Sequence, residues 1–120
     1  MLNPAEAERI ARDWLKAWNS HDLEAILSHY AEGAELTSPF VVQLLGNPAG
    51  IVRGKENLRM YFSLGLSMFP DLHLELIRVF TGVNSLVVYY RGINETLAAE
   101  VMVLNPEGQV IKTMAHYSTA

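Results

Sequence analysis

Residues 72–117 read LHLELIRVFTGVNSLVVYYRGINETLAAEVMVLNPEGQVIKTMAHY, and the pattern of this stretch sets the fold class. Four runs rich in apolar and β-branched residues alternate with three segments whose Gly, Asn and Pro content is typical of turns. The predicted strands span residues 72–80, 86–91, 96–104 and 109–117. Because the turns between them are short, successive strands are expected to run antiparallel as a meander.

One charged residue, Glu100, interrupts the apolar run LAAEVMVL at Leu97–Leu104. Side chains along a strand alternate between its two faces, and both faces of this strand are otherwise apolar. Glu100 is therefore expected in an apolar environment, where a carboxyl group has either a raised pKa or a specific partner. Two interpretations stay open: an acid–base group, or a structural Glu that either lies at the rim of a pocket or pairs with Arg91 or Lys112 of a neighbouring strand.

Helix signals dominate the first half of the chain. Asn3, followed by proline, is a typical N-cap and starts a helix predicted to reach Trp18. Asp22 is placed to cap a second, short helix, and Gly54 opens a third, with a short strand expected between them at residues 34–37. Helices first and strands afterwards indicate the α+β class rather than alternating α/β.

The segment PFVVQLLGNPAGIVR at residues 39–53 has no clear assignment. It is long, apolar and interrupted by Gly and Pro. Connections of this length in compact domains are often lids or binding loops. The alternative is an irregular extension with a short strand at residues 40–45.

Size and composition predict a single domain over residues 1–120. Half of the 120 residues are hydrophobic and 18% are charged, which is more apolar than is usual for a small globular chain. This excess predicts an apolar internal cavity or a buried subunit interface.

The charge and the reactive residue types exclude several kinds of function. A net charge of −4 provides no basic surface for nucleic acid or an anionic membrane. The chain has no cysteine, and its four histidines show no metal-ligand spacing, so no disulfide, metal or cofactor is expected. Since no secretory signal or membrane-spanning stretch is evident, the expected location is cytoplasmic.

Three motifs carry a family resemblance: WLKAWNSHDL at residues 14–23, YAEGA at 30–34 and GKE at 54–56. Together with the element order, they resemble the nuclear transport factor 2-like superfamily, and within it the SnoaL-like polyketide cyclase and ketosteroid isomerase branch. The resemblance implies a cystatin-like, cone-shaped roll in which a curved antiparallel sheet is wrapped by three N-terminal helices around an apolar pocket. It also implies a homodimer joined through the outer face of the sheet.

The resemblance also implies roles for individual positions. Glu100 matches a carboxyl group on a central strand that donates a hydrogen bond in the isomerases and resembles the acid–base residue of the cyclases. The tyrosine on the first helix of the isomerases is replaced by Trp14, and their aspartate before a proline is replaced by Ser38. Two of the three isomerase identities are therefore absent, and no Asp-Arg-Asp set typical of the related epoxide hydrolases is present.

These considerations predict Glu100 as the catalytic residue and a set of aromatic or polar residues as ligand contacts. The tyrosines of this set have an alternative interpretation, as core residues with a satisfied hydroxyl group. The predicted contacts are Trp14, Tyr30, Ser38, Phe40, Tyr61, Phe62, Tyr90, Met102 and Tyr117.

Two functions are compatible with these residues. The first is a cofactor-free isomerase, cyclase or lyase acting on a small apolar carbonyl compound. Glu100 would move a proton beside the carbonyl, while Tyr61 or Trp14 would donate a hydrogen bond to the developing oxyanion. The alternative is a non-catalytic ligand-binding or dimerisation module of the same fold.

Overall fold

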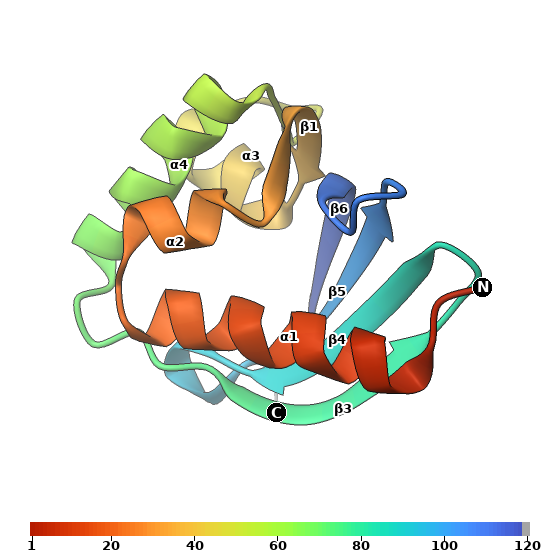
Figure 1. The fold of residues 1–120 in the computed structure, drawn as a ribbon. Helices are drawn as coiled ribbons and strands as arrows, with labels where there is room; N and C mark the ends of the chain where they lie inside the picture. Colours follow the sequence, from red (N-terminus) through yellow and green to blue (C-terminus); the bar gives the residue numbers. More distant parts are fainter. Residues whose placement is uncertain (119–120) are drawn as a thin grey trace.

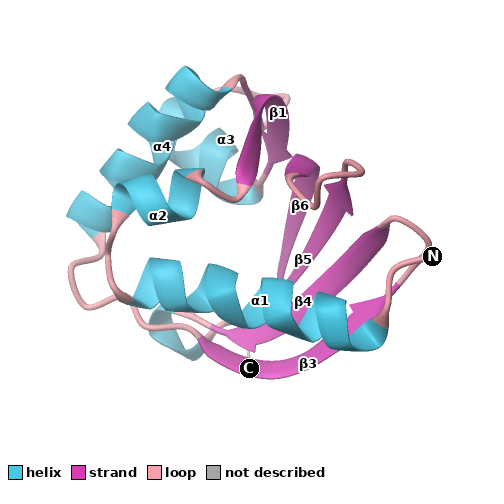
Figure 2. Cartoon of the chain, in the orientation of Figure 1, coloured by secondary structure: helices cyan, strands magenta, loops and turns pink. Residues whose placement is uncertain are grey.

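The computed structural model describes residues 1–118, and a six-stranded curved sheet organises them (Figure 1). Four α-helices and one 3-10 turn accompany the sheet. In chain order the elements are α1 (Pro4–Asn19), α2 (Leu23–Leu27), β1 (Tyr30–Thr37), α3 (Pro39–Leu45), β2 (Ile51–Arg53), α4 (Lys55–Met68), β3 (Glu75–Thr81), β4 (Ser85–Arg91), η1 (Ile93–Glu95), β5 (Leu97–Leu104) and β6 (Val110–Ser118). The α+β class is confirmed, with helices gathered on the inner side of the sheet (Figure 2).

The sheet has the strand order β2-β1-β6-β5-β4-β3. Strands β3 to β6 form the predicted antiparallel meander, with Glu100 of β5 paired to Val88 of β4 and Ala115 of β6. The expectation of a wholly antiparallel sheet is wrong, because β1 runs parallel to β6. A parallel pair needs a long connection, and here all the elements between β1 and β6 supply it.

The segment after β1 corrects a second expectation. Residues Pro39–Leu45 form a helix rather than a lid or a strand, so four α-helices replace the three predicted. The Ser38 side chain accepts a hydrogen bond from the Phe40 amide at 3.2 Å, proline occupies the first turn, and Gly46 ends the helix with a φ of 66°. These cap signals outweigh the β-branched residues of the segment. The strand in this region is Ile51–Arg53 instead.

Two predicted strand boundaries move for identifiable reasons. Tyr30 begins β1 and is buried there, rather than completing the short helix α2. β3 begins at Glu75 rather than at residue 72, because side chains of the α1–α2 region bind the backbone before it. The Asn19 amide exchanges two hydrogen bonds with the Leu74 backbone, at 2.6 and 2.9 Å, and His21 Nε2 lies 2.8 Å from the Leu72 carbonyl.

Helix α1 begins as predicted, with the Asn3 side chain accepting a hydrogen bond from the Ala5 amide at 2.7 Å. Its apolar side faces the interior and is buried. The buried residues of this helix are Ala7, Ile10, Ala11, Trp14, Leu15 and Ala17. On β5 the inward residues are Ala98, Glu100, Met102 and Leu104, and all four are buried. The alternation of β5 therefore directs Glu100 toward the helices.

Candidate functional site

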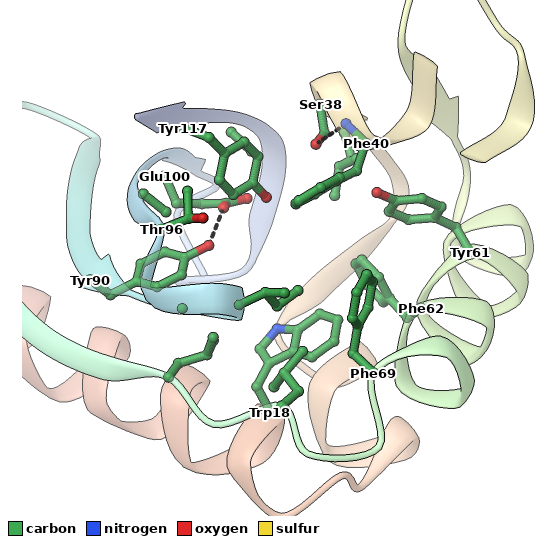
Figure 3. A pocket seen from close by; sticks show the side chains of 18 of the residues that line it. Trp18, Ser38, Phe40, Tyr61, Phe62, Phe69, Tyr90, Thr96, Glu100 and Tyr117 are labelled. Carbon is green, nitrogen blue, oxygen red and sulfur yellow. Dashed lines mark hydrogen bonds between the residues drawn. The ribbon is translucent and has the colours of Figure 1, made fainter. Parts of the chain in front are cut away.

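A partly open cavity of about 100 Å³ lies between the helices and the inner face of the sheet, and Glu100 forms part of its wall (Figure 3). Nine aromatic side chains in the described part of the chain, from α1, α3, α4 and its C-cap, and three strands, line this cavity. They are Trp14, Trp18, Tyr30, Phe40, Tyr61, Phe62, Phe69, Tyr90 and Tyr117. Ring contacts fix their arrangement, with Phe40 and Tyr117 at 4.6 Å and Trp18 and Phe62 at 5.1 Å between centroids.

Glu100 is 4% exposed, and each of its oxygens accepts a hydrogen bond from a hydroxyl group. The Tyr90 hydroxyl donates to Oε1 at 3.1 Å, and the Thr113 hydroxyl donates to Oε2 at 2.8 Å. Among the described residues no cation forms an ion pair with Glu100; Arg91 instead pairs with Glu95 at 3.7 Å. The structural ion-pair interpretation is therefore wrong. A carboxylate has about four acceptor positions, so Glu100 keeps free positions for a ligand.

Burial raises the pKa of Glu100 above its ordinary value, because removal from water penalises the charged form. The hydrogen bonds from Thr113 and Tyr90, and more weakly the charge of His116, act in the opposite direction. A raised pKa makes the carboxylate a stronger base and brings its protonated form closer to neutral pH. The group is thus suited to take up and return a proton.

The tyrosine hydroxyls of the cavity remain protonated donors. Burial raises the pKa of Tyr61 to about 12 and raises the pKa values of Tyr90, Tyr117 and Tyr30 further. Figure 3 shows the Tyr61 hydroxyl directed into the cavity from α4, across from Glu100, and the Tyr117 hydroxyl at the Glu100 end. Neutral hydroxyls on both sides of the cavity can donate hydrogen bonds to a ligand oxygen.

The two positions where this chain departs from the isomerase pattern have local structural roles. Trp14 Nε1 donates to the Tyr30 hydroxyl at 3.0 Å, and both side chains are buried. An indole has a single donor, so Trp14 has none left for a ligand oxygen. Ser38 is 3% exposed and caps α3, while its hydroxyl also interacts with Tyr61 and Tyr117.

Eight of the nine predicted contact residues line this cavity, and one does not. Met102 is fully buried but lies in the core outside the cavity wall. Alternation places it on the same side of β5 as Glu100, but does not tell how far along the strand the cavity extends. The expectation that Met102 contacts the ligand is therefore corrected.

Several wall residues were not predicted. They are Leu36, Leu44, Gly65, Phe69, Leu72, Leu74, Gly92, Ile93, Thr96, Ala98 and Ala115. Phe69 follows Phe62 by seven residues, and this helical spacing could have identified it. Ile93 reaches the cavity from the 3-10 turn between β4 and β5, and Thr96 directly after it; the Gly and Asn content of this segment predicted a turn but not its approach to the cavity.

Within residues 1–118, no group of three or more His, Asp or Glu side chains is arranged to hold a metal ion. In the same part of the chain, every helix is too short or too polar to cross a bilayer.

The curved sheet, the helices on its inner side and the cavity between them define a protein of the cystatin-like and nuclear transport factor 2-like class. Residues 11–119 match the model of the SnoaL-like domain, and the chain belongs to this family. A SnoaL-like protein of unknown function from Burkholderia thailandensis E264 is 47% identical, over 98% of this chain and 99% of that chain, with a TM-score of 0.93.

More distant structures share the fold. A candidate isomerase of the SnoaL-like family from Agrobacterium tumefaciens C58 is 18% identical, over 95% of this chain and 98% of that chain, with a TM-score of 0.76. The epoxide hydrolase/cyclase-like enzyme SalBIII, which has a role in pyran ring formation in salinomycin, is 19% identical, over 98% and 95% of the two chains, with a TM-score of 0.76. The comparison with curated proteins gives no match.

Proposed function

We propose that this protein is a cofactor-free isomerase or cyclase that acts on a small apolar carbonyl compound, with Glu100 as the acid–base group. The observation that carries the proposal is a carboxyl group 4% exposed in the wall of an aromatic cavity, held by two hydroxyl groups and no cation among the described residues. Burial of a carboxyl group without a counter-charge is costly, and carboxyl groups perturbed in this way cluster at functional sites. The isomerase and cyclase descriptions of the distant structural relatives are compatible with it.

The proton transfer follows from the position of Glu100. As a carboxylate, Glu100 removes a proton from the carbon beside the carbonyl. The electron pair of that C–H bond forms the C=C bond of an enolate, and the carbonyl π pair moves to oxygen. In an isomerisation, the protonated Glu100 returns the proton to a different carbon. In a cyclisation, the enolate carbon attacks a second carbonyl, and the new alkoxide receives the proton.

The enolate oxygen needs hydrogen-bond donors, and the cavity offers Tyr61 and Tyr117 for this role. Both line the cavity, and burial keeps the pKa of each hydroxyl so high that it stays protonated. Donors of this kind that are already in place are effective because they need no reorganisation during the reaction. Trp14 is the less suitable donor, since its N–H is bound to Tyr30.

Exchange of α-protons tests the proposal without knowledge of the natural substrate. Cyclohexanone, as a probe, is incubated with the protein in D₂O, and the loss of its α-proton signal is followed by NMR. The wild type is expected to accelerate exchange, and Glu100→Gln is expected to reduce the acceleration by about 10²–10⁴-fold, the usual contribution of a general base. The control is Glu107→Gln, which changes an exposed carboxylate in the turn before β6.

Equal exchange rates in wild type and Glu100→Gln would contradict the acid–base role. That result would favour the second candidate, a ligand-binding module without catalysis. One observation already favours this alternative: Trp14 and Ser38, which occupy the positions of two isomerase catalytic groups, make structural hydrogen bonds to Tyr30 and to the α3 backbone.

A further inference from the structure

The charge of the cavity wall limits the ligands that it can accept. Among the described residues, the wall contains no Lys, Arg or His, and Glu100 is its one carboxyl group. An anionic ligand would therefore lose its water without gaining a counter-charge, which is costly in an apolar cavity. Glu100 would add repulsion whenever it is ionised.

The volume of the cavity sets a second limit. A cavity of about 100 Å³ is smaller than the engineered apolar cavity of about 150 Å³ that binds benzene. A small ring or a short chain is therefore about the largest part of a ligand that this wall can surround without movement. The wall is built from interlocking aromatic rings on several elements, and such packing resists expansion.

The polar groups of the wall are not evenly distributed. Figure 3 shows Glu100, Tyr90, Tyr117 and Thr96 at one end of the cavity, and Phe62, Phe69 and Trp18 toward the other, where the Tyr61 hydroxyl is also directed into the cavity. Glu100 is itself more than nine-tenths buried, so the polar end is built into the interior rather than exposed at a rim. A ligand with one oxygen-bearing end and one apolar end matches this division.

We infer that the ligand is an uncharged compound of about one ring, which places a carbonyl or hydroxyl oxygen at the Glu100 end and its hydrocarbon part against Phe62, Phe69 and Trp18. This inference deepens the proposed function and rests on it for the role of the oxygen-bearing end. It excludes carboxylates, phosphates and multi-ring compounds as ligands. It also excludes organic ammonium ions, because an ammonium group would lose its water in an apolar cavity whose one carboxyl group among the described residues is itself buried.

A matched set of six-membered rings tests the inference. Cyclohexanone, cyclohexanecarboxylate, cyclohexylammonium and the two-ring ketone 2-decalone are titrated into the wild type. Binding is followed through the fluorescence of Trp14 and Trp18, both of which lie in the wall. Cyclohexanone is expected to bind at least about tenfold more tightly than each of the other three, because a buried charge or an oversized ring is penalised.

The remaining outcomes overturn the inference in distinct ways. Tighter binding of the carboxylate would show an anion site. Tighter binding of the ammonium ion would show an aromatic cage in which Glu100 is the counter-ion. Tighter binding of 2-decalone would show a cavity that expands, and absence of binding by all four would remove the ligand class altogether.

The result that would refute the proposed function differs from those that would refute the ligand class. Cyclohexanone that binds selectively but shows no Glu100-dependent α-proton exchange would refute catalysis and leave the ligand class intact. The variant Gly65→Leu, on the cavity side of α4, supplies a control for location, because no atom lies within 4 Å of a Cβ added at Gly65. It is expected to abolish cyclohexanone binding while the unfolding transition remains cooperative, and unchanged binding would contradict the assigned cavity.

Discussion

At the scale of single residues, the hydrogen bonds from Thr113 and Tyr90 determine which protonation states Glu100 can adopt. A hydroxyl group can donate to a carboxylate and accept from a carboxylic acid, so these two partners suit both protonation states of Glu100. Thr113 is fully buried beneath the carboxyl group, while Tyr90 also faces the cavity. Glu100 is thereby kept in place without a cation that would hold it permanently ionised.

Replacement of Glu100 by Gln is expected to change how stability depends on pH. Burial raises the pKa of Glu100 in the folded protein above the value of about 4.3 in the unfolded chain. Between these two pKa values the folded state binds more protons, so the stability of the wild type falls as the pH rises through this window. Gln does not titrate.

The free energy of unfolding of Glu100→Gln, relative to wild type, should therefore rise with pH from the unfolded pKa to the folded pKa. Urea unfolding at a series of pH values measures this difference. The groups that act on Glu100 are Tyr90, Thr113 and His116, and all are kept in the variant. A difference that stays constant with pH would mean that burial does not perturb the pKa of Glu100.

Thr113→Val tests the hydroxyl that lies beneath Glu100. The change keeps the shape of the side chain but leaves Oε2 without its donor, at an expected loss of about 1–3 kcal/mol in unfolding free energy. It should also raise the pKa of Glu100, because the hydrogen bond from Thr113 lowers it. Thr113→Ser is the matched control, since it keeps the hydroxyl; an equal effect on the Glu100 pKa would assign the role to the methyl group.

At the scale of elements, β5 and α3 show what sequence could and could not predict. The alternation of β5 placed Glu100 on an apolar face, and this followed from eight residues alone. The parallel pairing of β1 with β6 was missed, because it joins segments far apart in the chain and no local pattern specifies it. Helix α3 was missed because its β-branched residues obscured the Ser38-Pro39 start and the Gly46 end.

The site was predictable to the extent that it lies on regular elements. Tyr61 and Phe62 of α4 were found from helical spacing, and Glu100 from its strand. Met102 was assigned wrongly, because alternation defines a face but not the depth at which a cavity ends. Thr96 follows a 3-10 turn with positive φ at Asn94 and Glu95, and its approach to the cavity depends on that backbone.

Loss of the α3 cap is expected to loosen one wall of the cavity. Ser38→Ala removes the acceptor for the Phe40 amide and should cost about 0.5–2 kcal/mol, the usual range for an N-cap. Since α3 carries Phe40 and Leu44 into the cavity wall, probe binding should weaken as well. Hydrogen exchange of the α3 amides measures the loosening, and Ser38→Thr, which retains a capping hydroxyl, is the control. Unchanged protection in Ser38→Ala would contradict this role.

At the scale of the whole molecule, the outer face of the sheet carries an apolar row. Phe80 of β3 pairs with Val87 of β4, Val87 pairs with Val101 of β5, and Val101 pairs with Met114 of β6. Phe80 is 52% exposed. A continuous apolar row across four strands is unfavourable in water and supports the prediction of a homodimer through this face.

Sedimentation equilibrium tests that prediction. The wild type is expected to sediment as a dimer, and Val101→Lys, which places a charge in the centre of the row, should shift it to a monomer with its far-UV spectrum unchanged. Val83→Lys, at an exposed position in the loop between β3 and β4, is the control and should remain a dimer. A monomeric wild type would rule out this interface.

The sheet, the helices and the cavity together surround the Glu100 carboxyl group, and its titration is the most direct test of the proposed acid–base role. The ¹³C resonance of the Glu100 carboxyl is followed as a function of pH in the ligand-free wild type. Because burial raises the pKa of Glu100, the midpoint is expected clearly above the ordinary value of about 4.3. A midpoint at or below that value would show a carboxylate stabilised in its charged form and would contradict the acid–base role.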